Sequence, residues 1–137
     1  MDSYKDQARQ ILRLLRDIKP PEGQKDRVHV APAPNPVKSR HLGQDEADII
    51  FSDANQDADL GLMHNDFTES NIIVDQGRIV GVVDWEMAGF FGWKTAREVH
   101  ETIRSPRREN FAQFDGKKEY EGMMRKLFFW SNLYHVE

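Results

Sequence analysis

The chain has 137 residues, of which 39% are hydrophobic and 31% are charged, and its formal net charge is −4. This balance predicts one soluble globular domain over residues 1–137, without the basic stripe of nucleic-acid-binding proteins. Cysteine is absent, which excludes disulfide frameworks and thiolate metal sites. The N-terminus lacks the apolar stretch of a secretory signal, and no run approaches the roughly 18 apolar residues of a membrane span. We therefore expect a cytoplasmic protein that uses neither nucleic acid nor a membrane as a partner.

The first predicted element is an amphipathic helix over residues 3–18, which Pro20 and Pro21 bring to an end. Five of the six prolines fall between Pro20 and Pro36. We therefore expect residues 19–43 to form an irregular, proline-rich connection and not a core element. The predicted apolar stripe of the helix consists of Tyr4, Ala8, Ile11, Leu15 and Ile18.

The middle of the chain changes from helical to strand patterns and back again. A short helix is predicted over residues 45–52, and the runs "LGLM", "NIIVD" and "RIVGVVDW" read as strands. The helical period returns over residues 93–104 and again over 117–132. The predicted fold class is therefore α+β, mainly helical, with one central β-hairpin.

The turn of that hairpin is predicted at Gln76-Gly77, where glycine supplies a positive φ. This turn fixes a register in which the opposed pairs are Asp75 with Arg78, Val74 with Ile79, Ile73 with Val80, and Asn71 with Val82. In that register Asp84 lies on the same face as Asn71, roughly 7–8 Å away. An amide oxygen and a carboxylate that converge there suit one hard cation such as Mg²⁺.

The hairpin carries apolar residues on both faces, which predicts that it is packed within the protein. Burial makes the Asp84 carboxylate unfavourable unless it is paired or bound to a metal. Asp66 precedes Asn71 by five residues, in the loop that leads into the strand. A carboxylate beside a metal site is placed to orient a hydroxyl or to accept its proton.

The stretch "HNDFTESN" over residues 64–71 has the spacing His-x-Asp-x-x-x-x-Asn, and "VVDWEMAG" follows the hairpin. Together they resemble the catalytic loop and the metal-binding aspartate of the aminoglycoside phosphotransferase and choline kinase group, which has a protein-kinase-like fold. The closest likeness covers residues 60–92. The resemblance implies that Asp66 is the catalytic base and that His64 orders the catalytic loop. It also implies that Asn71 and Asp84 hold Mg²⁺.

The same resemblance implies an ATP-dependent transfer of a phosphoryl group to the hydroxyl of a small molecule. The acidic net charge is compatible with a cationic acceptor. Asn65 stands where the family usually has glycine, and asparagine tolerates unusual φ and ψ better than most residues.

The family also has a small strand-rich lobe that covers the nucleotide, and its signals are not found before the catalytic loop. The glycines there are Gly23, Gly43 and Gly61, so neither Gly-x-Gly nor Gly-x-x-Gly occurs. We expect the C-terminal, helical lobe of a kinase-like fold without its nucleotide lobe, as in a truncated phosphotransferase. Such a lobe exposes apolar surface, which predicts self-association.

Three alternatives stay open from the residues alone. The first is a kinase-like remnant that acts as an interaction module without catalysis. The second is a calcium loop, because Asp53, Asn55, Asp57 and Asp59 alternate as in an EF-hand, although Ala58 and His64 replace the required glycine and glutamate. The third is a metal hydrolase with His64, Asp66 and Asp84 as ligands.

Two further groups of residues are assigned structural roles. The cations after the hairpin are expected to be solvated helix charges: Lys94, Arg97, Arg104, Arg107 and Arg108. Helical spacing predicts a core position for the aromatic residues near the C-terminus: Phe128, Phe129, Trp130 and Tyr134.

Overall fold

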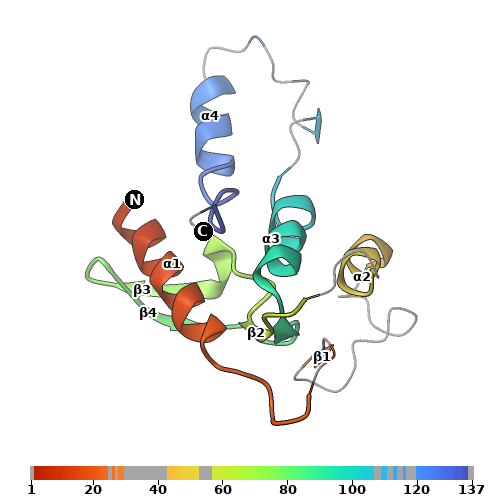
Figure 1. The fold of residues 1–137 in the computed structure, drawn as a ribbon. Coiled ribbons are helices and arrows are strands. Elements are labelled where there is room, and N and C mark those ends of the chain that lie inside the picture. Colours follow the sequence, from red (N-terminus) through yellow and green to blue (C-terminus); the bar gives the residue numbers. More distant parts are fainter. Residues whose placement is uncertain are drawn as a thin grey trace.

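The computed structural model describes residues 2–24, 26, 28–29, 43–52, 57–106, 109–110, 113, 116 and 120–135. Within them, the α-helices are α1 (Asp2–Arg16), α2 (Gln44–Ile50), α3 (Trp93–Thr102) and α4 (Tyr120–Leu127). The strands are β1 (Val28–His29), β2 (Gly61–Met63), β3 (Ile72–Asp75), β4 (Arg78–Val82) and β5 (Gly89–Phe91), and the 3₁₀ turn η1 (Glu69–Asn71) precedes β3. The α+β class is therefore confirmed (Figure 1).

Helix α1 packs its apolar stripe onto strands β2 and β4, where Ala8 and Leu12 are completely buried. Figure 1 shows the helix crossing the β3–β4 hairpin. The side chain of Gln7 ties the two together: its Nε2 donates to the carbonyl of Gly77 at 3.0 Å, and its Oε1 accepts from the amide of Ile79 at 2.8 Å. The predicted stripe was wrong at Ile18, which is 49% exposed, because the helix ends at Arg16.

A small antiparallel sheet has the strand order β1-β5-β2, and the 64–71 loop follows β2 directly. Strands β1 and β5 were not predicted. Val28 pairs with Phe90 although residues 19–43 are predicted to be irregular, and Gly89–Phe91 lies outside every predicted strand. Both strands are two or three residues long, too short to show a periodic pattern.

The hairpin turn is confirmed, since both Gln76 and Gly77 have positive φ and Asp75 pairs with Arg78. A bulge between Ile73 and Val74 then shifts the register, so that Ile73 pairs with Gly81 and Ile72 pairs with Val82. The predicted pairs Ile73 with Val80 and Asn71 with Val82 are therefore wrong. The extra residue of a bulge displaces all later pairs by one position, so the shared face predicted for Asn71 and Asp84 has no support in this register.

The hairpin is also more exposed than predicted. Ile73, Val74 and Val80 are 50%, 47% and 60% exposed, and Asp84, just beyond β4, is exposed as well. The apolar pattern on both faces was therefore a poor guide to burial, because α1 covers only part of this two-stranded ribbon.

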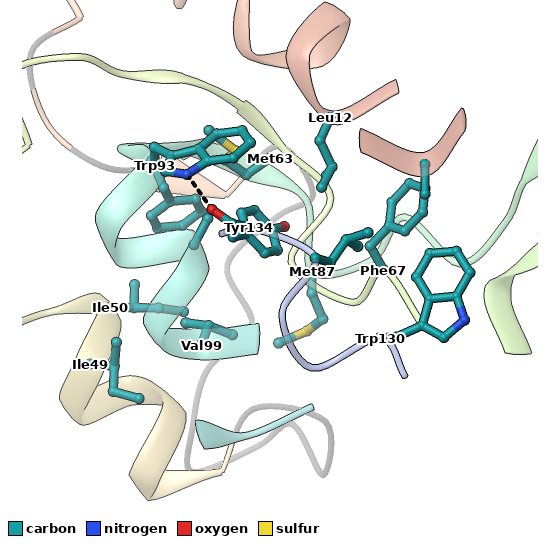
Figure 2. Packing of buried hydrophobic residues seen from close by; sticks show 14 of the residues in the cluster. Leu12, Ile49, Ile50, Met63, Phe67, Met87, Trp93, Val99, Trp130 and Tyr134 are labelled. Carbon is teal, nitrogen blue, oxygen red and sulfur yellow. Dashed lines mark hydrogen bonds between the residues drawn. The ribbon is translucent and has the colours of Figure 1, made fainter. Parts of the chain in front are cut away.

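The core lies between α1, α2, α3 and the segment after α4 (Figure 2). The indole nitrogen of Trp93 donates to the carbonyl of Tyr134 at 3.1 Å, which fixes the C-terminal segment against α3. The predicted core positions of Trp130 and Tyr134 are confirmed, whereas Phe128 and Phe129 are only partly buried. The buried cluster consists of Ala8, Leu12, Ala47, Ile49, Ile50, Met63, Phe67, Met87, Phe91, Trp93, Ala96, Val99, Trp130, Leu133 and Tyr134. Among the described residues, no helix is long and apolar enough to cross a bilayer.

Candidate functional site

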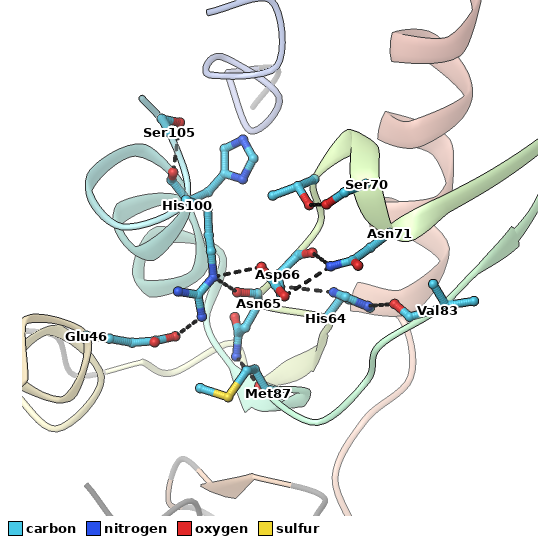
Figure 3. Close-up of polar contacts among 12 residues, drawn as sticks. Glu46, His64, Asn65, Asp66, Ser70, Asn71, Val83, Met87, His100 and Ser105 are labelled. Carbon is cyan, nitrogen blue, oxygen red and sulfur yellow. Dashed lines mark hydrogen bonds and ion pairs between the residues drawn. The ribbon is translucent and has the colours of Figure 1, made fainter. Parts of the chain in front are cut away.

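His64 follows β2 directly and is completely buried. Its Nε2 lies 2.9 Å from the carbonyl oxygen of Val83, and its Nδ1 accepts a hydrogen bond from the backbone amide of Asp66 at 3.1 Å. A carbonyl can only accept, so Nε2 carries the proton and Nδ1 carries none. Burial lowers the pKa of His64 below its usual value, against opposing contributions from the Val83 hydrogen bond and the charges of Asp66 and Asp84. The imidazole is therefore neutral, and it connects Val83, just after β4, to the backbone of Asp66 through two hydrogen bonds (Figure 3).

Asn65 occupies the left-handed region with φ +66°, in agreement with the tolerance predicted for asparagine at this position. Its Nδ2 donates to the carbonyl of Met87 at 3.1 Å, so the side chain ties the 64–71 loop to the turn that follows Asp84. The Oδ1 of Asn65 is buried and has no hydrogen-bond partner in the described part of the chain. A glycine at this position could adopt the same backbone conformation, but it would lack the hydrogen bond to the Met87 carbonyl.

Asp66 and Asn71 face each other across the loop. The Nδ2 of Asn71 donates to the Asp66 carbonyl oxygen at 2.8 Å and to its carboxylate Oδ2 at 3.0 Å. Asn71 is buried, whereas the Asp66 side chain is 24% exposed. Asp66 is thus partly open to a ligand, while Asn71 fixes one of its carboxylate oxygens (Figure 3).

Arg104 is a member of this site that the sequence did not reveal. It follows α3, and its side chain is only 13% exposed, so its predicted role as a solvated helix charge is wrong. Its Nε lies 3.0 Å from the Asp66 Oδ1 and donates to the Asn65 carbonyl at 3.0 Å, while its second terminal nitrogen pairs with Glu46. Glu46 is itself 1% exposed, on the inner face of α2.

The other predicted cations agree with solvated positions where they are described. Lys94 is exposed, and Arg97 is 41% exposed and pairs with Glu101 one turn along α3. Arg107 and Arg108 lie outside the described residues.

Asp84 lies just after β4 with φ +60°, an unusual conformation for a residue with a side chain. The residue before it, Val83, accepts a hydrogen bond from the Nε2 of His64 at 2.9 Å, which places Asp84 next to a residue in contact with His64. The next residue, Trp85, packs its indole against the His64 ring with the centroids 4.6 Å apart. Asp84 therefore stands at the exposed edge of the same group of residues as His64 and Asp66.

The residues available for a cation are oxygen donors. The Nδ2 of Asn71 faces Asp66, so the amide oxygen of Asn71 points away from Asp66. Asp84 has an exposed carboxylate. Carboxylate and amide oxygens suit Mg²⁺, which usually keeps several waters or phosphate oxygens as further ligands. Among the described residues, no group of three or more histidines and acids is clustered to hold a metal ion. Both ring nitrogens of His64 are already engaged with backbone groups of Val83 and Asp66, so His64 has no free lone pair for a hydrolase metal.

The calcium-loop alternative gains no support from the part of it that is described. Both carboxylate oxygens of Asp57 accept from the hydroxyl of Thr95, each at 2.9 Å. This carboxylate is therefore hydrogen-bonded to the first turn of α3. Asp59 is exposed, and Asp53 and Asn55 lie outside the described residues.

A pocket of about 250 Å³ runs along the loop on the Arg104 side. Its lining includes the loop residues Thr68, Glu69 and Ser70, which lie between Asp66 and Asn71 in the sequence. The remaining lining includes His100, Arg104 and Trp130, so the cavity has both apolar and hydrogen-bonding surface.

The comparison with family models identifies the chain. The model described as the phosphotransferase enzyme family matches residues 5–90, which include most of α1, the 64–71 loop, the hairpin and Asp84. The chain belongs to this family. Among curated proteins and solved structures, none matches it.

Proposed function

We propose that this phosphotransferase family member is the helical lobe of a kinase-like fold and transfers the terminal phosphoryl group of ATP to a hydroxyl of a small molecule. The observation that carries the proposal is the partly exposed Asp66 carboxylate, which Asn71 holds at 3.0 Å inside the loop that the family model covers. Phosphoryl transfer needs from the protein mainly positioning and electrostatic stabilisation.

Asp66 would receive the hydrogen of the acceptor hydroxyl and orient its oxygen toward the terminal phosphorus. The oxygen then forms the new bond to phosphorus as the bond to the ADP oxygen breaks, and the hydroxyl proton passes to Asp66 or to water. His64 contributes indirectly, because its unprotonated Nδ1 accepts the backbone amide of Asp66 and so sets the loop.

Asn71 and Asp84 are the residues that would hold Mg²⁺, since they offer an amide oxygen and an exposed carboxylate. When bound, the ion would neutralise charge on the phosphates. The pocket beside Thr68, Glu69 and Ser70 is the proposed entry for the acceptor. The Glu69 carboxylate favours an acceptor with an amino group, such as an amino sugar or amino alcohol.

A transfer assay tests this function. The purified chain is incubated with MgATP and separately with choline, ethanolamine and aminoglycosides, and phosphorylated product is followed by ³¹P NMR and mass spectrometry. Asp66→Asn should lower kcat by about 10²–10⁴-fold, the usual contribution of a positioned base. Asp75→Asn removes an exposed carboxylate at the far end of the same hairpin and should leave kcat unchanged. Equal rates in wild type and Asp66→Asn would contradict the role of Asp66.

A further inference from the structure

Arg104 links three segments that are distant in the sequence. It comes from the end of α3, it reaches Asp66 and Asn65 in the 64–71 loop, and it pairs with Glu46 on α2. Its Nε–H is shared between the Asp66 Oδ1 and the Asn65 carbonyl, both at 3.0 Å. One guanidinium therefore contacts the side chain of the proposed base and the backbone just before it.

Glu46 is what holds the guanidinium in place. Its carboxylate is 1% exposed, so it needs a charged partner, and Arg104 is the one that reaches it. A buried ion pair of this kind adds little net stability compared with apolar residues, because both charges lose their hydration. Its placement behind Asp66 instead suggests a role in the geometry of the site.

The two carboxylate oxygens of Asp66 are held by different residues. Oδ1 is paired with Arg104 at 3.0 Å, and Oδ2 accepts from Asn71 at 3.0 Å. With a donor on each oxygen, the carboxylate cannot rotate about its own axis without losing a contact. Reacting groups must be held in a narrow range of positions, and a displacement of about 1 Å can lower a rate by about 10²-fold.

We propose that Arg104, anchored by Glu46, is a positioning residue that fixes the plane of the Asp66 carboxylate for phosphoryl transfer. The proposal rests on the proposed function. Lysine cannot replace arginine here, since its compact ammonium group lacks the planar fork that reaches Glu46 on one side and Asp66 with Asn65 on the other. The side chain acts through Asp66 and has no contact of its own with the phosphoryl group in this scheme.

The kinetic test compares Arg104→Lys and Arg104→Met with Arg97→Met. Arg97 is a matched control because it lies on α3, just before Arg104 in the chain, and pairs with a carboxylate, Glu101, at 2.9 Å. Both Arg104 variants should lose about 10–10²-fold in kcat with little change in the KM for MgATP, and Arg97→Met should keep the wild-type kcat. Wild-type kcat in Arg104→Lys would overturn the proposal, and so would a loss that appears only as a raised KM.

A spectroscopic test separates this proposal from the proposed function. The side-chain amide protons of Asn71 report the hydrogen bond to Asp66, so they can be followed in ¹H–¹⁵N spectra without any substrate. In Arg104→Lys these resonances should move toward the values of a solvated amide, while those of Arg97→Met stay at the wild-type positions. Unmoved Asn71 resonances in folded Arg104→Lys would overturn the positioning role even if wild type is active. Moved resonances in a chain without transfer activity would support the positioning and count against the proposed function alone.

Discussion

Asn71 makes two hydrogen bonds to one residue: its Nδ2 donates to the Asp66 backbone carbonyl at 2.8 Å and to the Asp66 carboxylate at 3.0 Å. The pair closes the 64–71 loop on itself, because the η1 turn brings residue 71 back beside residue 66. The Asn71 carbonyl in turn accepts from the amide of Val83 at 2.8 Å. The position of Asp66 thus depends on Asn71, whose backbone is hydrogen-bonded to the residue that follows β4.

Replacing Asn71 should destabilise the folded chain. Asn71→Ala leaves the Asp66 carbonyl without its side-chain donor, which should lower the free energy of unfolding by about 1–3 kcal/mol. Urea denaturation followed by tryptophan fluorescence measures the difference. Ser70→Ala is the neighbouring control, because the Ser70 hydroxyl is exposed and bonds only to the Thr68 hydroxyl among the described contacts. Equal losses in the two variants would mean that the Asn71–Asp66 bonds do not order the loop.

Stability should fall in mild acid because burial disfavours the charged form of two histidines in the folded protein. Burial lowers the pKa of His64 and of His100, whose Nε2 lies 2.6 Å from the carbonyl of Trp130. The unfolded chain then binds protons below about pH 6.5 that the folded chain does not. Stability is therefore complete above that pH and decreases below it, by up to about 1.4 kcal/mol per pH unit for each histidine.

Urea denaturation between pH 7.5 and 5.5 tests this dependence. His100→Gln keeps a donor for the Trp130 carbonyl but does not titrate, so its stability should fall less steeply than that of wild type. Glu46 acts in the opposite sense at lower pH, since burial raises its pKa and the folded chain takes up that proton first. Parallel curves for wild type and His100→Gln would show that His100 does not contribute.

Gly61 is required by a close approach of two backbones. A Cβ at position 61 would lie 2.2 Å from the carbonyl oxygen of Arg16, at the end of α1. Gly61→Ala should therefore force α1 away from β2 and lower the melting temperature markedly, at a cost of about 1–3 kcal/mol or more. Gly122→Ala is the control: no atom lies within 4 Å of the place its Cβ would take, and alanine in helix α4 should stabilise by roughly 0.5–1 kcal/mol. A Gly61→Ala variant as stable as wild type would contradict this packing.

The exposed hairpin and the core should respond differently to substitution. Val80 is 60% exposed, so Val80→Thr should change the free energy of unfolding by less than about 0.5 kcal/mol. Leu12 is completely buried in the cluster, and Leu12→Ala should cost about 2–5 kcal/mol. Chemical denaturation of both variants checks the contrast. A large loss at Val80 would mean that the hairpin face is covered in the folded protein.

The parts of the fold that depend on local chemistry could be predicted from the sequence. The Gln76-Gly77 turn, the start of α3 at Trp93 and the positive φ of Asn65 follow from residue types at particular positions. The bulge beside Val74 could not be predicted, because it depends on how α1 and the loop hold the two strands. A register inferred from turn type alone is therefore valid only near the turn.

The ion pairs of Arg104 could not be predicted either, since Glu46 lies 58 residues before it. One signal was present in the sequence. Glu46 shares the inner face of α2 with Ile49 and Ile50, and all three are buried. A carboxylate on the apolar face of a helix calls for a cationic partner, although the pattern does not say which of the chain's basic residues provides it.

We propose that Asp84 and the 64–71 loop form a magnesium–nucleotide site, and a thermal melt tests this site most directly. The chain is melted with and without MgATP, beside Asp84→Asn, with Asp75→Asn as the control. Asparagine tolerates the φ of +60° at position 84, so the variant removes the charge without adding backbone strain. At 100 times the dissociation constant, MgATP should stabilise wild type by about 2.7 kcal/mol, a rise of several degrees in melting temperature.

We predict that this rise requires magnesium, persists in Asp75→Asn and disappears in Asp84→Asn. An equal rise in Asp84→Asn, or no rise in a wild-type chain that melts cooperatively, would contradict the magnesium–nucleotide site.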